Sequence, residues 1–201
     1  MDAFVNRSKV GKFPWISFNG EEVEDSQFSI DYLKEKFKVD LNNDYSSADI
    51  AAGRAVRRML EEGTFWSLAL SRTIYNLGSE YLKKMNIKWW QIWIIGRLIN
   101  KRAKAQGTGL HSKEKVIKVG LDDLRTISHF LGNSNKKYFL GETPSEVDAT
   151  IFGFVTQFIY TFPDTDYDRV SKEKFKNLYS YCDRMREKFW PDWNECITDK
   201  P

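Results

Sequence analysis

Ser145 and Asp148 lie three residues apart at the start of an apolar run, and a hydroxyl beside a carboxylate could take part in catalysis. The same spacing defines a capping box. In that motif the Asp148 carboxylate accepts from the Ser145 backbone N–H, and the Ser145 hydroxyl accepts from the Asp148 N–H. Pro144 before the pair and Glu146 within it also suit the start of a helix. We therefore interpret Ser145 and Asp148 as a structural capping box and assign no catalytic role to them.

Three aspartates further along resemble the start of a calcium loop. Asp164, Asp166 and Asp168 have the alternate spacing of an EF-hand. The sixth position of the loop is Arg169 and the twelfth is Phe175, where an EF-hand requires glycine and a bidentate glutamate. The sequence therefore predicts no calcium site here.

Histidines and cysteines give no metal site or nucleophile either. His111 and His129 are the only histidines, and neither has a Cys or His partner at ligand spacing. Cys182 and Cys196 form no CxxC pair, which suits a reducing compartment and a cytoplasmic location. Cys182 falls on the apolar stripe of an expected helix, so we interpret it as a buried, unreactive thiol.

Composition limits the class of protein. The chain has 201 residues, of which 41% are hydrophobic and 29% charged, as expected for a globular domain with a core of its own. A net charge of +3 is too small to indicate a nucleic-acid partner. The sequence contains no uninterrupted apolar run of about 18 residues, so it predicts no ordinary membrane span.

Residues 87–105, IKWWQIWIIGRLINKRAKA, combine tryptophans with basic side chains. Such a composition is typical of a helix that lies on a membrane surface. It also fits a core helix whose exposed end is basic, and we favour this interpretation. RNA binding is a more distant alternative, because no RNA-binding motif accompanies the segment. If the segment faces a membrane, the residues that would do so are Trp89, Trp90, Trp93, Lys101 and Arg102.

The first forty residues predict a small αβ unit. The run FPWISF, the turn Asn19-Gly20 and the return strand EEV form a hairpin signal. Asp25 or Ser26 can then cap a helix. An isolated two-stranded hairpin is marginal in water. Either another chain or another part of a longer product completes this sheet, or this end of the chain is loosely folded.

The rest of the chain predicts helices. Ser46 and Asp49 form a second capping box that opens a long helix to about Tyr75. On that helix we expect two ion pairs at i,i+4 spacing, Arg57–Glu61 and Arg58–Glu62. Further helices are expected from Ser112 to Gly132, from Ser145 to Phe162, and from Ser171 or Glu173 to Trp190. The prediction is a mainly α (α+β) chain, with a partial αβ piece over 1–40 and a helical domain over 46–195.

In series, these pieces resemble the glutathione-transferase fold, most closely its failed axon connections and metaxin branch. The stretches that carry the resemblance are GKFPWISFNGEEVEDSQF, KAQGTGLHSKEK, KKYFLGETPSEVDATIFG and MREKFWPDWN. The capping box is shared by transferase-like folds in general. The glycine-rich turn and KFWPDW favour the failed axon connections branch. The resemblance implies an all-helical, transferase-like C-terminal domain after an incomplete thioredoxin-like hairpin and helix.

The resemblance also implies a glutathione site. Pro14 would be the cis-proline of a thioredoxin-like domain, and the backbone of Phe13 would meet the cysteinyl part of glutathione. Asp25 and Ser26 would match the acidic–Ser pair at a helix start, where N–H groups and a hydroxyl receive a carboxylate. For Ser26 we favour the simpler role of a helix N-cap.

The departure from the family pattern concerns activity. The family's first strand, helix and second strand have no counterpart here, and transferases carry their catalytic Tyr, Ser or Cys in that region. Two hypotheses follow. In the first, which we favour, the chain is a non-catalytic interaction or membrane-adaptor protein with a protein partner and no nucleic acid. In the second, it is a shortened product of a glutathione-dependent transferase or glutathione-binding protein, with glutathione as cofactor.

Overall fold

The computed structural model describes Ser8 and residues 14–76, 88–132 and 136–196, without the side chains of Trp89 and Cys196. The chain separates into two compact units, Met1–Asp44 and Tyr45–Pro201. The boundary falls in the polar connection that the sequence analysis left between the αβ piece and the helical domain.

The described part of the first unit contains a hairpin of two antiparallel strands, β1 (Trp15–Phe18) and β2 (Glu21–Glu24). The turn between them is the predicted Asn19-Gly20 dipeptide. Asn19 has φ 50° and Gly20 has φ 83°, and two successive residues with positive φ are typical of a tight hairpin turn.

Helix α1 (Ser26–Phe37) packs on one face of this hairpin. The Phe18 ring lies edge-on to the Phe37 ring at 5.4 Å between centroids. Asp25 is the N-cap of α1, and its side chain accepts from the Gln27 N–H at 2.9 Å. Ser26 is the first helical residue. The interpretation of Ser26 as the N-cap is therefore wrong, because the Asp25 carboxylate already takes that position.

The second unit begins with one long helical stretch. Ser46 caps it, with its hydroxyl accepting from the Asp49 N–H at 3.2 Å, as the capping-box spacing predicts. Two π-helical segments interrupt the α-helical path. In order, the parts are α2 (Ser47–Arg58), η1 (Met59–Thr64), α3 (Phe65–Leu70) and η2 (Ser71–Tyr75).

Further helices complete the described part of this unit. They are α5 (Trp89–Gln106), η3 (Thr108–Leu110), α6 (Lys113–Gly132), α7 (Glu146–Thr161), α8 (Asp166–Lys174), α9 (Lys176–Phe189) and α10 (Trp193–Cys196). Together with the hairpin, they confirm the prediction of a mainly α-helical (α+β) fold.

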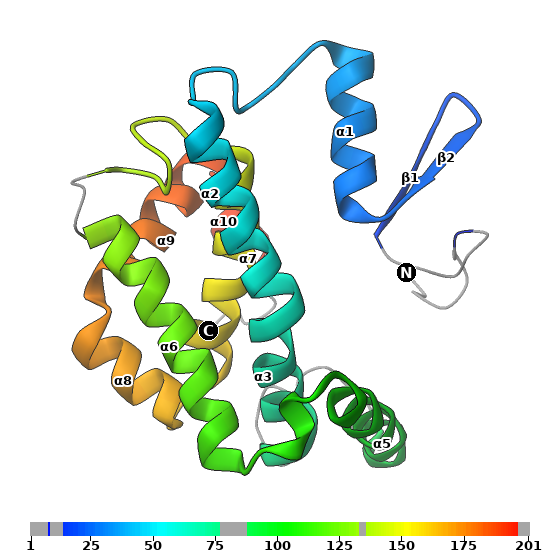
Figure 1. Cartoon of the computed structure of the whole chain (residues 1–201), viewed down its shortest axis with the longest axis vertical. Helices are drawn as coiled ribbons and strands as arrows, with labels where there is room; N and C mark the ends of the chain where they lie inside the picture. Colours follow the sequence, from blue (N-terminus) through cyan, green and yellow to red (C-terminus); the bar gives the residue numbers. More distant parts are fainter. Residues whose placement is uncertain (1–7, 9–13, 77–87, 133–135, 197–201) are drawn as a thin grey trace. The chain divides into compact units, whose positions relative to one another are not determined.

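Helix α7 lies in the middle of the helical unit, in contact with α2, α3, α8 and α9 (Figure 1). Its inward side chains belong to the main hydrophobic core, and Ile151, Val155 and Phe158 are fully buried. The helix ends at Thr161, close to its expected end at Phe162, because Phe162 precedes Pro163 and the residue before a proline is disfavoured in the helical region.

One predicted helix start and one predicted ion pair of this unit are wrong. The helix expected to begin at Ser171 or Glu173 is two helices, since Thr165 caps α8 and Phe175, at φ −122°, separates it from α9. The expected Arg57–Glu61 pair is replaced by an ion pair between Arg57 and Glu146 at 3.5 Å. This pair joins α2 to the start of α7, a contact that spacing along one helix cannot predict.

Candidate functional site

The Asp148 carboxylate is a buried hydrogen-bonding centre. The predicted capping box is present at the start of α7, where Oδ2 accepts from the Ser145 N–H at 2.8 Å and from the Ser145 hydroxyl at 2.6 Å. Oδ1 accepts from the Phe139 N–H at 2.8 Å and from the Tyr181 hydroxyl at 2.9 Å. Asp148 has no exposed surface. Each carboxylate oxygen therefore serves two donors of the fold, and no substrate can reach it.

Two side chains of α9, Tyr181 and Cys182, are poor nucleophiles. Burial raises the pKa of the Tyr181 hydroxyl well above its ordinary value, and the nearby Asp148 charge raises it further. Burial also raises the pKa of the Cys182 thiol to about 12. A thiol with that pKa is protonated at neutral pH, and the protonated form is a weak nucleophile. Cys182 is therefore the buried, unreactive thiol that its position in the sequence predicted.

The residues that the resemblance assigns to glutathione come together at the start of α1. The Asp25 N–H donates to the Pro14 carbonyl at 3.0 Å, so the proline lies beside the helix start. Pro14, Asp25 and Ser26 are exposed. Phe13, the fourth residue of the set, lies outside the described residues. The described part is one exposed corner that could meet a carboxylate through the Ser26 hydroxyl and the first turn of α1.

A polar cluster on the same unit was not predicted. The Tyr32 hydroxyl of α1 donates to the Glu21 carboxylate of β2, and the Lys36 ammonium lies 3.4 Å from that carboxylate. The hydrogen bond to Glu21 raises the pKa of Tyr32. Activation of a thiol by tyrosine needs a lowered pKa, so we interpret the cluster as packing of α1 on the hairpin. Only the pairing of β2 with α1 could have revealed it.

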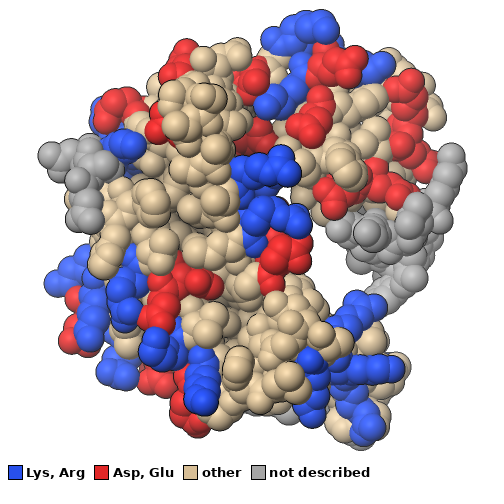
Figure 2. Space-filling view, in the orientation of Figure 1, with Lys and Arg blue, Asp and Glu red and all other residues tan. Residues whose placement is uncertain are grey.

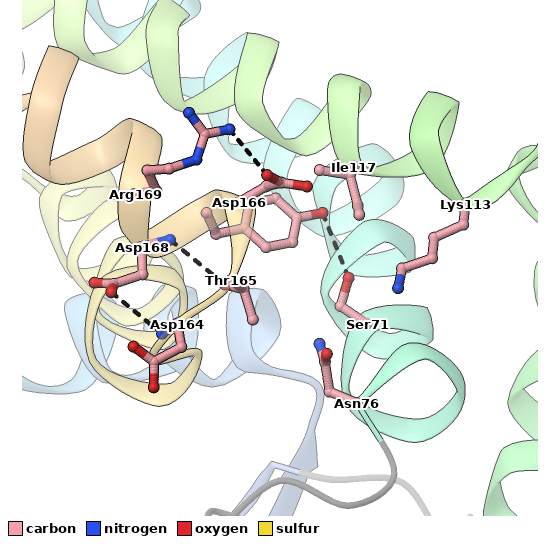
Figure 3. Close-up of a pocket in the computed structure, with 10 residues that line it drawn as sticks. Ser71, Asn76, Lys113, Ile117, Asp164, Thr165, Asp166, Asp168 and Arg169 are labelled. Carbon is pink, nitrogen blue, oxygen red and sulfur yellow. Dashed lines mark hydrogen bonds and ion pairs between the residues drawn. The ribbon is translucent and has the colours of Figure 1, made fainter.

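The helical unit contains a polar pocket of about 590 Å³ between η2, the start of α6 and the start of α8 (Figure 3). Inside it the Ser71 hydroxyl lies 3.4 Å from the Tyr167 hydroxyl, and Asp166 pairs with Arg169 at 3.0 Å. Burial raises the pKa of Tyr167 to about 12, so this tyrosine remains protonated at neutral pH and cannot act as a base.

Helix α5, which holds most of the Trp-rich segment, packs through its smallest side chains. Ala103 is fully buried in a small core cluster, with Ile99 packed against it. A Cβ added to Gly96 would lie 2.9 Å from the Thr73 carbonyl oxygen, which shows how closely α5 approaches η2. The contact face of α5 is therefore narrow and lined by Gly96, Ile99 and Ala103.

The largest described side chains of α5 lie on the outside. Five apolar residues are between 41% and 56% exposed: Trp90, Trp93, Ile94, Ile95 and Leu98. The Arg97 guanidinium lies over the Trp93 ring, 4.8 Å from its centroid. The interpretation as a core helix is wrong for Trp90 and Trp93, because the small residues take the contact face. Lys101 and Arg102 are exposed as well.

Positive charge is concentrated in and after α5. Between residues 97 and 118 there are seven basic residues and one acidic residue, Glu114, so this stretch has a net charge of +6, whereas the whole chain has +3. In the lower right of Figure 2, Lys and Arg side chains gather over α5, which Figure 1 shows in the same orientation. The seven basic residues are Arg97, Lys101, Arg102, Lys104, Lys113, Lys115 and Lys118. We call this surface the α5 face. It consists of the exposed apolar residues and the basic residues of α5: Trp90, Trp93, Ile94, Ile95, Leu98, Arg97, Lys101, Arg102 and Lys104.

Neither a metal site nor a membrane span is found in the part of the chain that the structure describes. No group of three or more His, Cys, Asp or Glu side chains there could hold a metal ion. The described helices also lack the combination of length and apolar character needed to cross a bilayer.

Comparison with known families identifies the class of protein. The family "Glutathione S-transferase N-terminal domain" matches residues 2–78, and the family "Glutathione S-transferase, C-terminal domain" matches residues 120–185. The N-terminal match runs past the Asp44–Tyr45 boundary into the first helices of the second unit. The chain belongs to the glutathione S-transferase-like proteins.

Individual relatives place it within that class. The chain is 30% identical to "Failed axon connections" of Drosophila melanogaster over 96% of its own length and 50% of the relative's. It is 26% identical to "Metaxin-2" of Mus musculus, over 61% of this chain and 45% of the relative. It is 27% identical to "Isoprene-epoxide--glutathione S-transferase" of Rhodococcus sp. (strain AD45), over 89% and 78%. The similarities to failed axon connections and metaxin-2 confirm the failed axon connections and metaxin-like branch of the fold.

The chain spans about half the length of failed axon connections and of metaxin-2. No solved structure matches it.

Proposed function

We propose that this chain is a non-catalytic adaptor of the glutathione-transferase fold, with its helical unit as the binding platform. The observation that carries the proposal is the α5 face. Five large apolar side chains, each at least 41% exposed, gather on a single helix. Contiguous apolar surface of this kind is typical of an interaction site, whereas isolated exposed apolar residues are ordinary.

The polar groups of the helical unit support the same proposal. The Asp148 carboxylate serves four donors of the fold, and the buried Cys182 thiol has a pKa of about 12. Both groups stabilise the core and are withdrawn from solvent. Neither of these two groups is therefore available to a substrate, which supports a role for this unit in binding a partner through its surface.

The relatives' names agree with this division. "Failed axon connections" and "Metaxin-2" name no reaction, whereas the Rhodococcus relative is named for glutathione transfer to isoprene epoxide. We propose that this chain follows the first two, with a protein partner or a membrane surface and no nucleic acid. Its cysteine usage supports a cytoplasmic location.

A glutathione-dependent function is the second candidate, and it has a specific observation in its favour. Pro14, Asp25 and Ser26 adjoin at an exposed helix start, where a carboxylate could be received. Against it, the Asp25 carboxylate is already used to accept from the Gln27 N–H. This corner alone supplies no group that lowers the pKa of the glutathione thiol, and an unperturbed thiol near pKa ~8.5 is mostly protonated at neutral pH.

Calorimetry with glutathione and a conjugation assay with a standard electrophile test the two candidates together. We expect no turnover above the uncatalysed rate and a Kd no tighter than about millimolar, near −4 kcal/mol. Ser26→Ala should leave both results unchanged. Ser47→Ala is the matched control, because Ser47 also follows directly on an N-cap residue. Micromolar binding that Ser26→Ala abolishes and Ser47→Ala preserves, or real turnover, would establish the glutathione-dependent function instead.

A further inference from the structure

We propose that the α5 face binds an anionic membrane surface, with α5 lying in the plane of the headgroups. This proposal rests on the adaptor function above and names the partner of one of its surfaces. It follows from three properties of α5: the position of its apolar residues, the distribution of its charge, and the close packing of its contact face.

The apolar residues form a stripe along the helix. Trp90, Ile94 and Leu98 are spaced at i,i+4, so they follow one another along one side of α5. This side is opposite to the side that carries Gly96 and Ala103. Over its 18 residues α5 is about 27 Å long at 1.5 Å per residue. A stripe parallel to the helix axis allows the helix to lie flat in an interface, where Trp rings are favoured.

The charge of α5 selects the kind of surface. The helix contains no acidic residue, and Lys101 continues the apolar stripe while Arg97 and Arg102 flank it. Long basic side chains can keep their stems along apolar surface and extend their charged ends to the headgroups. The apolar first half would therefore enter the acyl boundary, while the basic second half lies against anionic headgroups.

The attachment of α5 favours binding without refolding. Gly96 approaches the backbone of η2 closely, and Ala103 is fully buried. Many interfacial helices must fold when they bind, which costs free energy. Since α5 is already a helix on a packed support, its face is presented in the orientation that binding requires.

Cosedimentation of the 201-residue chain with mixed phosphatidylserine–phosphatidylcholine vesicles tests the proposal. We expect binding at low salt, weaker binding as salt is raised, and a blue shift of Trp fluorescence. Vesicles of phosphatidylcholine alone should bind much more weakly. Because a basic residue near an anionic surface contributes about fivefold in affinity, the double variant Lys101→Glu/Arg102→Glu should lose at least about 25-fold.

Matched variants distinguish vesicle binding through the α5 face from binding that depends only on net charge or on exposed apolar residues elsewhere. Lys174→Glu/Lys176→Glu makes the same change in net charge on exposed residues of α8 and α9, and should lose less than about fivefold. A second pair concerns the apolar stripe. Ile94→Ser/Leu98→Ser should weaken binding, whereas a double substitution of two exposed aliphatic residues elsewhere, Ile50→Ser/Val119→Ser, should not.

Several results would overturn the proposal. They are no binding to anionic vesicles at low salt, equal binding to neutral vesicles, or equal losses in both charge-reversal pairs. Size-exclusion chromatography with light scattering adds another: a dimer that Ile94→Ser/Leu98→Ser dissociates would mean that a second copy covers the face. Glutathione turnover would end the adaptor proposal without touching the vesicle result, and failed vesicle binding would leave the non-catalytic assignment intact, so the two failures are distinguishable.

Discussion

For Asp148→Ala, the structure and the capping pattern predict different losses in the free energy of unfolding. The pattern alone involves one cap, and the loss of a cap costs about 0.5–2 kcal/mol. The structure adds partners from outside the motif, since Phe139 and Tyr181 also donate to this carboxylate. Truncation to alanine would therefore leave four buried donors without their acceptor.

The expected cost follows from which of these donors can find another acceptor. The hydroxyls of Ser145 and Tyr181 can rotate, and Tyr181 has the Asp148 carbonyl at 3.1 Å as a second acceptor. The backbone N–H groups of Phe139 and Ser145 cannot turn, and both residues are at most 3% exposed. A buried donor left unsatisfied costs about 1–3 kcal/mol. We expect Asp148→Ala to lower the free energy of unfolding by about 4 kcal/mol, a large part of a typical total of about 5–15 kcal/mol.

Urea unfolding, followed by far-UV circular dichroism, measures this loss. Asp49→Ala is the matched control, because Asp49 also lies three residues after a serine N-cap and accepts from the Ser46 hydroxyl, but it is only half-buried. It should cost about 1 kcal/mol. Asp148→Asn retains one acceptor oxygen and should fall between the two, which keeps the comparison open if the alanine variant does not fold. An Asp148→Ala variant that loses no more stability than Asp49→Ala would refute the reasoning.

Two further predictions concern pH and packing. The pKa values of Tyr167 and Cys182 are raised to about 12, and the pKa of Tyr181 is also raised, so the folded chain retains protons that the unfolded chain releases. Stability should be full below about pH 8 and fall as pH rises towards 12. Each group contributes a loss of about 1.4 kcal/mol per pH unit above its unfolded pKa, which is about 9 for the thiol and about 10 for the tyrosines. The urea midpoint measured from pH 8 upward checks this, and a flat profile above pH 10 would contradict it. Gly96→Ala should destabilise the fold by about 1 kcal/mol, because overpacking against the η2 backbone outweighs the gain in helix propensity. Gly153→Ala should stabilise the fold by about as much, because the space around its added Cβ is open. Melting temperatures that move in the same direction for both variants would contradict the packing argument.

The features predicted best from the sequence are those that depend on near neighbours in the chain. The Asn19-Gly20 turn requires two residues that tolerate positive φ, and both do adopt it. The N-caps at Ser46 and Ser145 depend on a partner three residues away, so their spacing identifies them. The order of such local signals also carried the resemblance to the transferase fold.

The features that the sequence could not supply depend on contacts between distant residues. Arg57 has an acidic residue four positions later, yet its carboxylate partner is Glu146 of α7. Likewise, the capping pattern gives Asp148 a local partner, while Tyr181, 33 positions later, is supplied by the packing of α9 on α7. Spacing within one helix identifies candidate partners, and the tertiary fold decides which are used.

The α5 face is where local pattern and tertiary structure conflict, and the conflict makes the surface testable. Large apolar residues normally occupy the contact face of a helix, because their burial stabilises the fold most. In α5, Gly96 and Ala103 take that face instead. Gly96 has no side chain and allows the helix to approach the η2 backbone closely, and Ala103 is fully buried. Ile94 and Leu98, about half exposed, therefore contribute little to folding. Substitutions at these two positions should change binding while changing the free energy of unfolding by no more than the ordinary range for surface sites, about 0.5 kcal/mol. A loss of vesicle binding in Ile94→Ser/Leu98→Ser can then be attributed to the face itself.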